Sequence, residues 1–97
     1  LYKEYIIEAK AEVLGGMVIL HAQRWSIDGS GLLERPNDWM INWGDGTQST
    51  LQDAKWDSSS QVFGGSLRWS HYYTSPGQYI ISIHVAGVSK ELMVNIP

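Results

Sequence analysis

The 97-residue chain contains no cysteine and three prolines, and its longest purely aliphatic or methionine run is Met17–Leu20. Without cysteine it can form neither a disulfide scaffold nor a site built on a thiolate. A transmembrane helix needs about 20 consecutive apolar residues, so the sequence predicts no membrane insertion. Seven basic residues stand against ten acidic ones, for a formal charge of −3. This balance argues against a nucleic-acid partner, because such affinity comes mostly from basic groups on phosphates.

The length is that of one domain spanning residues 1–97, with no room for a second core. The chain begins at Leu1, without an initiator methionine or a basic segment leading into an apolar one. We therefore expect a module of a larger protein. We find no internal repeat, low-complexity tract or linker.

Apolar and polar residues alternate along most of the chain, and no segment of helical length keeps a 3.6-residue apolar period. Strict alternation is typical of half-buried strands. It is clearest in 78–86, where Tyr79, Ile81, Ile83 and Val85 share one face. Glycine-rich and Pro-Gly turns separate seven such segments, with an irregular polar stretch over 54–60. The predicted strands are 2–8, 17–23, 39–43, 47–52, 61–69, 78–86 and 88–96.

About seven short strands in fewer than 100 residues favour an all-β fold, an antiparallel β-sandwich. Two motifs make the expectation more specific. The segment Ile41–Thr47 reads INWGDGT, and His71–Ile83 reads HYYTSPGQYIISI. Together they resemble the PKD (polycystic kidney disease) domain, and the resemblance covers about 18–96. Two departures are a longer connection over 51–70 and Asn42 in place of a common aspartate.

The resemblance implies an immunoglobulin-like sandwich with a non-catalytic role. The function expected from it is a spacer or protein–protein interaction and adhesion module. The expected location is extracellular, at a cell surface or at a virion surface. The expected partners are neighbouring domains of the parent protein or another protein.

The first motif can be interpreted from its residues alone. Gly44 and Gly46 flank Asp45, so the chain can reverse through positive φ without a Cβ clash. The Asp45 carboxylate can accept from the backbone N–H or hydroxyl of Thr47, as in an Asx-type turn. Trp43, at the start of the turn, alternates with Ile41 and is expected in the core. We predict a structural role for this turn rather than a metal site.

The second motif contains Tyr73 and Tyr79 on either side of a Pro76-Gly77 turn, in which Pro76 suits φ near −65° and Gly77 suits positive φ. One of the tyrosines is expected to donate a hydrogen bond back to the backbone, as in the tyrosine corner of other sandwiches. His71 is expected to act as a hydrogen-bonding strap.

We predict that the chain is not an enzyme. A serine protease-like triad can be assembled on paper from Ser66 or Ser70 with His71 and Asp45. However, no Gly-x-Ser-x-Gly nucleophile elbow is present, and adjacent Ser70 and His71 must point to opposite faces of a strand.

Metal and cofactor sites are not expected either. His21 and His84 should lie in different sheets and face outward, apart from His71, so a three-histidine metal site is not expected. No phosphate-cradling glycine loop joins a strand to a helix. Calcium is the one ion with a weak case, because oxygen-rich segments begin at Asp28 and run from Asp53 to 59. Solvated loops explain these segments more simply, since no EF-hand spacing is present.

The chain is rich in aromatic residues, with five tryptophans and five tyrosines. Trp39 and Trp43 alternate with Ile41 and are expected in the core. Trp56 lies in a polar stretch, and Trp25 and Trp69 also lack a clear core position. These three are candidate binding residues, because exposed aromatic rings suit sugar stacking or a protein hot spot.

Two interpretations of these rings stay open. In one, the chain is an accessory carbohydrate-binding module that uses exposed tryptophans, with a polysaccharide as partner. In the other, Trp56 packs over a sheet edge.

Overall fold

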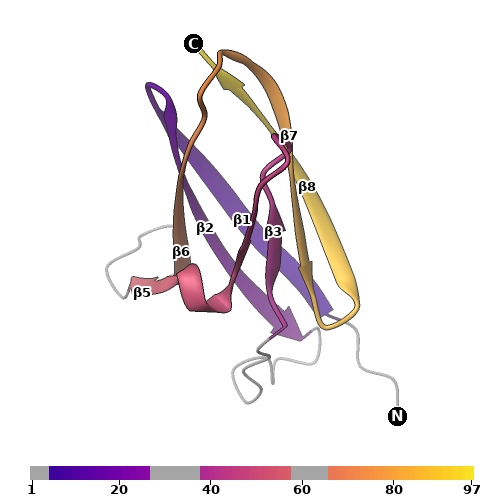
Figure 1. The fold of residues 1–97 in the computed structure, drawn as a ribbon. Helices are drawn as coiled ribbons and strands as arrows, with labels where there is room; N and C mark the ends of the chain where they lie inside the picture. Colours follow the sequence, from indigo (N-terminus) through magenta and orange to yellow (C-terminus); the bar gives the residue numbers. More distant parts are fainter. Residues whose placement is uncertain (1–4, 27–37, 58–65) are drawn as a thin grey trace.

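A computed structural model of the chain describes residues 5–26, 38–57 and 66–97, and these residues form strands and one short 3₁₀ turn (Figure 1). The eight described strands compare with about seven expected. In chain order the elements are β1 (Tyr5–Leu14), β2 (Met17–Ser26), β3 (Met40–Asn42), β4 (Gln48–Thr50), η1 (Leu51–Asp53), β5 (Lys55–Asp57), β6 (Ser66–Tyr72), β7 (Gly77–Val85) and β8 (Val88–Ile96).

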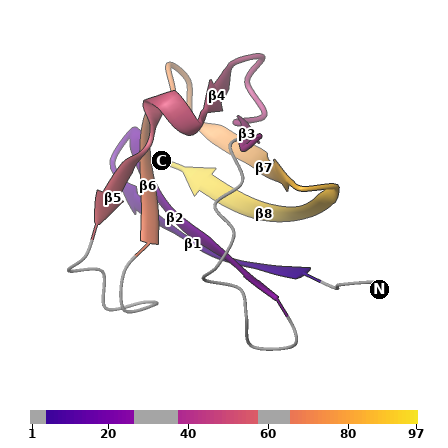
Figure 2. The same ribbon diagram turned by 90° about the horizontal axis from the view of Figure 1, so that it is seen from below.

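The strands form two four-stranded sheets in which every pairing is antiparallel. Sheet A has the order β1-β2-β6-β5, and sheet B has the order β4-β3-β7-β8. Viewed from below, the sheets are two layers that face each other (Figure 2). The chain is therefore an all-β protein with sandwich architecture, as expected.

The core lies between the two sheets because both contribute their apolar faces to it. In sheet A, Val18, Leu20 and Ala22 alternate along β2 and are fully buried. In sheet B, Ile81 and Ile83 on β7 are equally buried. The predicted apolar face of 78–86 is thus the inner face, with Tyr79 at its less buried end. The other buried apolar residues are Ile7, Trp39, Ile41, Trp43, Trp69, Tyr73, Val85, Val94 and Ile96.

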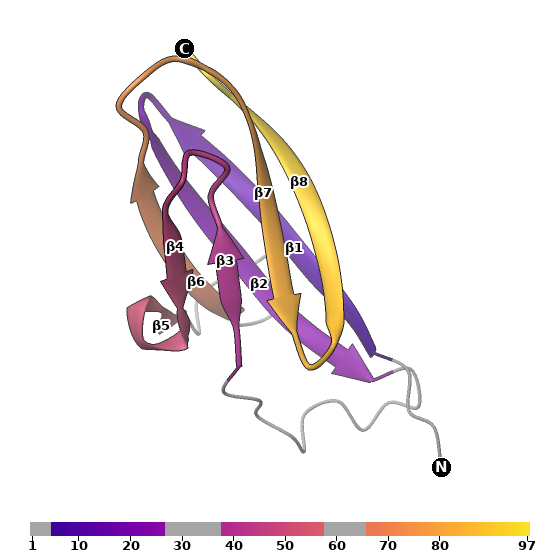
Figure 3. The same cartoon turned by 45° about the vertical axis from the view of Figure 1, so that its right-hand side comes forward.

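The two sides of the sandwich differ in their edge strands. On one side, η1 carries the chain from β4, the edge of sheet B, to β5, the edge of sheet A, and both strands have three residues. On the other side, the long strands β1 and β8 lie beside each other (Figure 3). Short edges limit pairing with other chains, and charged Glu8, Lys10 and Glu12 alternate along the long edge strand β1.

Several strand boundaries differ from those predicted. The first strand, predicted over 2–8, continues to Leu14 because it pairs with β2 through the Gly15-Gly16 turn, and 2–4 lie outside the described residues. The polar segment 55–57 was expected to be irregular but forms β5, which antiparallel pairing with β6 stabilises. The strand predicted over 61–69 begins at Ser66 and runs to Tyr72, and 61–65 lie outside the described residues. In the part of the chain that is described, no helix is long and apolar enough to cross a membrane.

Candidate functional site

The clearest constellation of functional groups lies on the turn between β3 and β4, where Trp43–Thr47 reverse the chain. The Trp43 backbone N–H donates to the Thr47 carbonyl at 3.1 Å and closes the hairpin. Gly44 and Gly46 have φ of +84° and +90°, the region that favours glycine. A Cβ on Gly44 would lie 2.5 Å from the Ile80 carbonyl oxygen, whereas one on Gly46 would meet nothing within 4 Å. Gly44 therefore lets the turn pass directly against β7.

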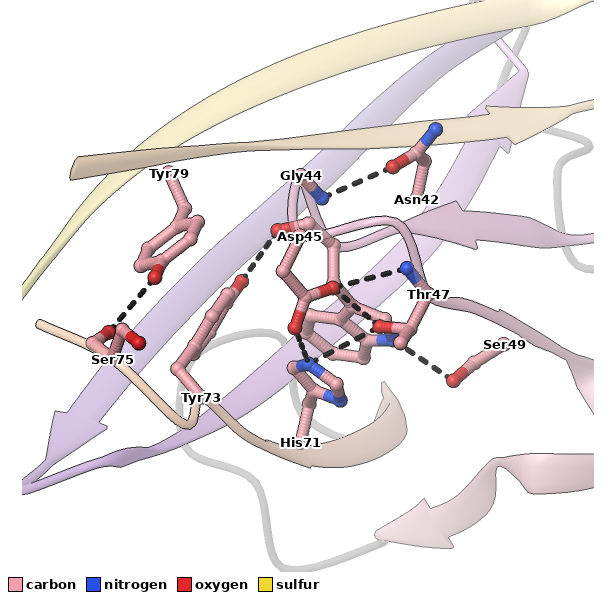
Figure 4. A network of polar contacts seen from close by, with 10 residues as sticks. Asn42, Gly44, Asp45, Thr47, Ser49, His71, Tyr73, Ser75 and Tyr79 are labelled. Atoms are coloured by element: carbon pink, nitrogen blue, oxygen red, sulfur yellow. Dashed lines mark hydrogen bonds and ion pairs between the residues drawn. The ribbon is translucent and has the colours of Figure 1, made fainter. Parts of the chain in front are cut away.

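Asp45 organises the turn through its carboxylate (Figure 4). Its Oδ1 accepts from the Thr47 backbone N–H at 3.1 Å and also from the Thr47 hydroxyl. This is the Asx-type turn that the sequence predicts. At the start of the same turn, the Asn42 side-chain oxygen accepts from the Gly44 N–H at 3.0 Å. An amide oxygen thus does what a carboxylate oxygen would do at position 42.

His71 on β6 reaches across from the other sheet and ties this turn down. Its Nε2 lies 2.7 Å from Asp45 Oδ2 and 3.3 Å from the Thr47 hydroxyl (Figure 4). Both partners are partly sheltered, with 16% of the His71 side chain and 20% of the Asp45 side chain exposed. The predicted strap is confirmed, and its partner is Asp45.

Four aromatic rings, those of Trp43, His71, Tyr73 and Tyr79, form a continuous cluster. The imidazole lies nearly parallel to the Trp43 indole, with centroids 4.7 Å apart and planes at 12°. His71 and Tyr73 meet at nearly a right angle with ring centroids 4.8 Å apart, and Tyr73 packs on Tyr79 with ring centroids 4.3 Å apart. Offset-stacked and edge-to-face pairs of this kind each contribute about 0.5–1.5 kcal/mol beyond their buried area.

Hydrogen bonds from three of these residues fix the ring cluster to the backbone and to β4. Tyr73 donates its buried hydroxyl to the Trp43 carbonyl at 2.7 Å, and Tyr79 donates to the Ser75 carbonyl at 2.8 Å. Trp43 donates its indole N–H to Ser49 Oγ at 2.9 Å. Both tyrosines, not one, thus return a hydrogen bond to the backbone. Gly77, the predicted glycine of the following turn after Pro76, has φ of +143°.

The environment shifts two pKa values in opposite directions. Burial raises the pKa of Asp45, but hydrogen bonds from Thr47 and His71 outweigh it, so the Asp45 pKa lies below its ordinary value. Burial, with the nearby charges of Asp45 and Tyr79, raises the pKa of Tyr73 to about 12. The cluster therefore favours an ionised Asp45 and a neutral Tyr73 at neutral pH.

Only two members of the Ser-His-Asp triad considered from the sequence lie together in the structure. Asp45 and His71 are in contact, but Ser70 is exposed on the opposite face of β6. Ser66 lies at the far end of the same strand, where it pairs with Asp57 on β5. The Nε2 of His71 is occupied by Asp45 and Thr47. The arrangement suits fastening a turn to a strand better than activating a hydroxyl.

The other two histidines lie apart from His71, on strands of different sheets. His84 on β7 is exposed. His21 takes the outer face of β2, as expected, but only 6% of it is exposed. It stands in register between Lys10 on β1 and Arg68 on β6, and its Nε2 contacts Glu12 Oε1 at 3.1 Å. The outward placement of His21 is therefore as expected, but the sequence did not predict its burial on that face.

The calcium candidates divide between described and undescribed residues. The segment at Asp28 lies outside the described residues. Asp53 accepts from the Thr50 N–H at 2.8 Å, and Asp57 lies 3.9 Å from Arg68. Within residues 5–26, 38–57 and 66–97, no group of three or more His, Asp or Glu could hold a metal ion.

Two of the candidate binding tryptophans, Trp69 and Trp56, differ widely in exposure. Trp69 is 1% exposed, packs against Trp39 with centroids 5.6 Å apart, and donates its indole N–H to the Thr50 carbonyl at 2.9 Å. It belongs to the core, so its place among the binding residues is corrected. Trp56 is 64% exposed on the edge strand β5. The side chain of Trp25 lies outside the described residues.

Two contacts of this site were not foreseen, the Ser49 partner of Trp43 and the stacking of Trp43 on His71. The first depends on the β3–β4 register, and the second on two sheets meeting at the turn. The alternation of residues along one strand indicates neither the register between two strands nor a contact between two sheets. No family model, curated protein or solved structure matches this chain.

Proposed function

We propose that this chain is a non-catalytic, PKD-like module of immunoglobulin type that serves as a spacer or protein–protein interaction module. In this proposal its parent is an extracellular, cell-surface or virion-surface protein. The observation that best supports this function is the path of the chain. The strand β1 starts at one end of the molecule, and β8 finishes at the other (Figure 1). The long axis is 45 Å, against 27 and 21 Å for the others. Such a module, placed between two neighbours, separates them by its full length.

The strand order supports the immunoglobulin-type assignment. Immunoglobulin constant domains place strands A, B, E and D in one sheet and C, F and G in the other. Sheet A has this order when β1, β2, β6 and β5 are equated with strands A, B, E and D. Sheet B has it when β3, β7 and β8 are equated with strands C, F and G. The strand β4 then extends sheet B beside β3. The backward hydrogen bonds of Tyr73 and Tyr79 add a feature that other sandwiches share.

The role of the Trp43–Thr47 turn also supports a structural module. The groups that could do chemistry there are engaged with one another: both Asp45 oxygens have partners, and the hydroxyls of Thr47 and Tyr73 donate to acceptors in the cluster. Such saturation stabilises the fold and leaves little for a substrate.

The spacer proposal is tested by joining one, two and three copies of the chain between two folded reporter proteins. Small-angle X-ray scattering then gives the distance between the reporters. An increment close to the 45 Å long axis for each added copy supports a spacer. Increments near 21–27 Å would instead mean that neighbours pack side by side, and the proposal would fail.

A carbohydrate-binding module is the second candidate, and Trp56 is the observation that favours it. An exposed indole on an edge strand is a platform on which a sugar ring can stack. Titration of the domain with a panel of polysaccharides, followed by tryptophan fluorescence, tests this candidate. A saturable change in the wild type that Trp56→Ala removes, with fluorescence of the core tryptophans unchanged, favours carbohydrate binding over the spacer. Tyr72→Ala, at another exposed ring, is the matched control.

A further inference from the structure

The Asp45-Gly46 pair combines a sequence and a conformation that are prone to backbone rearrangement. A glycine after an aspartate leaves its backbone nitrogen unshielded by any side chain. Here both residues are exposed, Gly46 has φ of +90°, and beyond Gly46 and its two chain neighbours no atom lies within 4 Å of where its Cβ would be. Gly46 therefore lies on an exposed surface turn, and no side chain of its own shields its nitrogen.

The reaction at such a pair is intramolecular and needs no co-reactant except water. The Gly46 nitrogen attacks the Asp45 Cγ, the N–Cγ bond forms, and the carboxyl hydroxyl leaves with the amide proton as water. The product is a five-membered succinimide. Water then opens the ring at either carbonyl, and opening at the original backbone carbonyl yields isoaspartate. No oxidation or reduction takes place.

The surroundings of Asp45 oppose the first step. For attack, the carboxyl must rotate so that Cγ approaches the Gly46 nitrogen, but Thr47 holds Oδ1 and His71 holds Oδ2. The same contacts lower the pKa of Asp45. An ionised carboxylate is a poor electrophile because it has no hydroxyl to release as water, so the contacts act on both geometry and reactivity.

We propose that Asp45-Gly46 is a latent isomerisation site, and that Thr47 and His71 protect it by holding both carboxylate oxygens. Isoaspartate places one extra methylene in the main chain and shortens the side chain. The carboxylate can then no longer span from the turn to His71 and Thr47 at once. Isomerisation would thus release the β3–β4 turn from β6 without a break in the chain.

The test compares the folded wild type with His71→Phe and Thr47→Val. The first variant keeps a ring to stack on Trp43 but removes the hydrogen bond to Oδ2, and the second removes the hydroxyl but keeps the backbone N–H. Each protein is incubated at 37 °C, and isoaspartate at residue 45 is measured by peptide mapping with electron-transfer fragmentation. The urea-denatured chain gives the unprotected rate. Asp28-Gly29, the other Asp-Gly pair of the sequence, serves as internal reference.

We expect folded wild type to form isoaspartate at residue 45 more slowly than the denatured chain. Either variant should raise that rate by about tenfold, because losing one hydrogen bond to a charged group shifts a population by that order. The rate at the Asp28-Gly29 reference should stay unchanged. The proposal is wrong if folded variants react at the wild-type rate, or if folded wild type reacts as fast as the denatured chain. Near-ultraviolet circular dichroism checks folding, and if His71→Phe fails to fold, Thr47→Val decides alone.

Discussion

Asp45 is the residue on which the candidate site depends most, because it links its own turn to the opposite sheet. Its carboxylate accepts from Thr47 and contacts His71, and these contacts favour its ionised form. The Asp45 pKa lies below its ordinary value near 3.8, since Thr47 and His71 outweigh the opposing effect of burial. A carboxyl group with a depressed pKa stabilises the fold above its unfolded-state pKa.

The corresponding prediction concerns acid stability. As pH falls from about 4 toward the lowered Asp45 pKa, protonation removes the contribution of this carboxylate. In urea unfolding between pH 2 and 6, Asp45→Asn should therefore lack one component of the acid-induced loss. We expect that component to be about 1 kcal/mol or less, because the pair is partly exposed. Parallel wild-type and Asp45→Asn stability profiles down to pH 2 would contradict the assignment.

Tyr73 gives a second prediction at this scale, with the opposite sign. Its raised pKa, about 12, means that the folded state favours the neutral phenol. The associated stability is complete below the unfolded-state pKa near 10 and declines as pH rises toward 12. In an absorbance titration at 295 nm, one of the five tyrosines should ionise late. Tyr73→Phe should remove that late step, and its persistence in the variant would assign it to another residue.

Individual residues of this site differ in how far the sequence could place them. The spacing of Asp45 and Thr47 predicts the local Asx-type contact, since two residues separate acceptor and donor. His71 was expected to be a strap, but its partner Asp45 is 26 positions away and emerges only once the sheets are placed. Trp69 was a candidate binding residue because the sequence pattern indicated no clear core position for it. In β6 it stands opposite Leu20, and that register takes it into the core.

At the scale of elements, the β3–β4 hairpin depends on how closely it passes β7. Gly44 is the point of contact, and two effects oppose any side chain there. Its φ of +84° disfavours L-residues, and an added Cβ would lie 2.5 Å from the Ile80 carbonyl oxygen. Gly46 shares the positive φ but has open space around it. A substitution at Gly46 therefore measures the cost of backbone strain alone, whereas one at Gly44 measures strain together with steric overlap.

Gly44→Ala should destabilise the fold more than Gly46→Ala. Positive φ alone costs an alanine roughly 1 kcal/mol, which is the effect expected for Gly46→Ala. The overlap with the Ile80 backbone adds to this at Gly44, because β7 is a central strand and cannot move freely. Urea unfolding midpoints measure both costs. Equal losses would mean that the hairpin does not press on β7.

The elements also show where prediction from alternation ends. The β8 boundaries match the predicted 88–96, because its alternation is long and its flanking turn is clear. The short β5 was missed, since Lys55-Trp56-Asp57 carries no apolar alternation and becomes a strand through pairing with β6. Short edge strands of this kind are set by the neighbouring strand rather than by their own composition.

At the scale of the whole molecule, the direction of the first and last strands determines how the module would sit in a longer chain. The long strands β1 and β8 lie beside each other, and each pairs along its full length with an inner strand. Figure 3 shows that both extend along the long dimension of the sandwich. The all-β architecture was predictable from composition and alternation. The proposal of a spacer depends on this end-to-end path.

The most direct test of that path is a distance between its two ends. Because the chain has no cysteine, the double variant Tyr5→Cys and Pro97→Cys can carry two spin labels at unique positions. Double electron–electron resonance then measures their separation in the folded domain. The account predicts one narrow distribution centred at about 30 Å, the length of a ten-residue strand such as β1. A distribution near the spacing of packed sheets, about 10 Å, would place both ends at one pole and contradict the spacer.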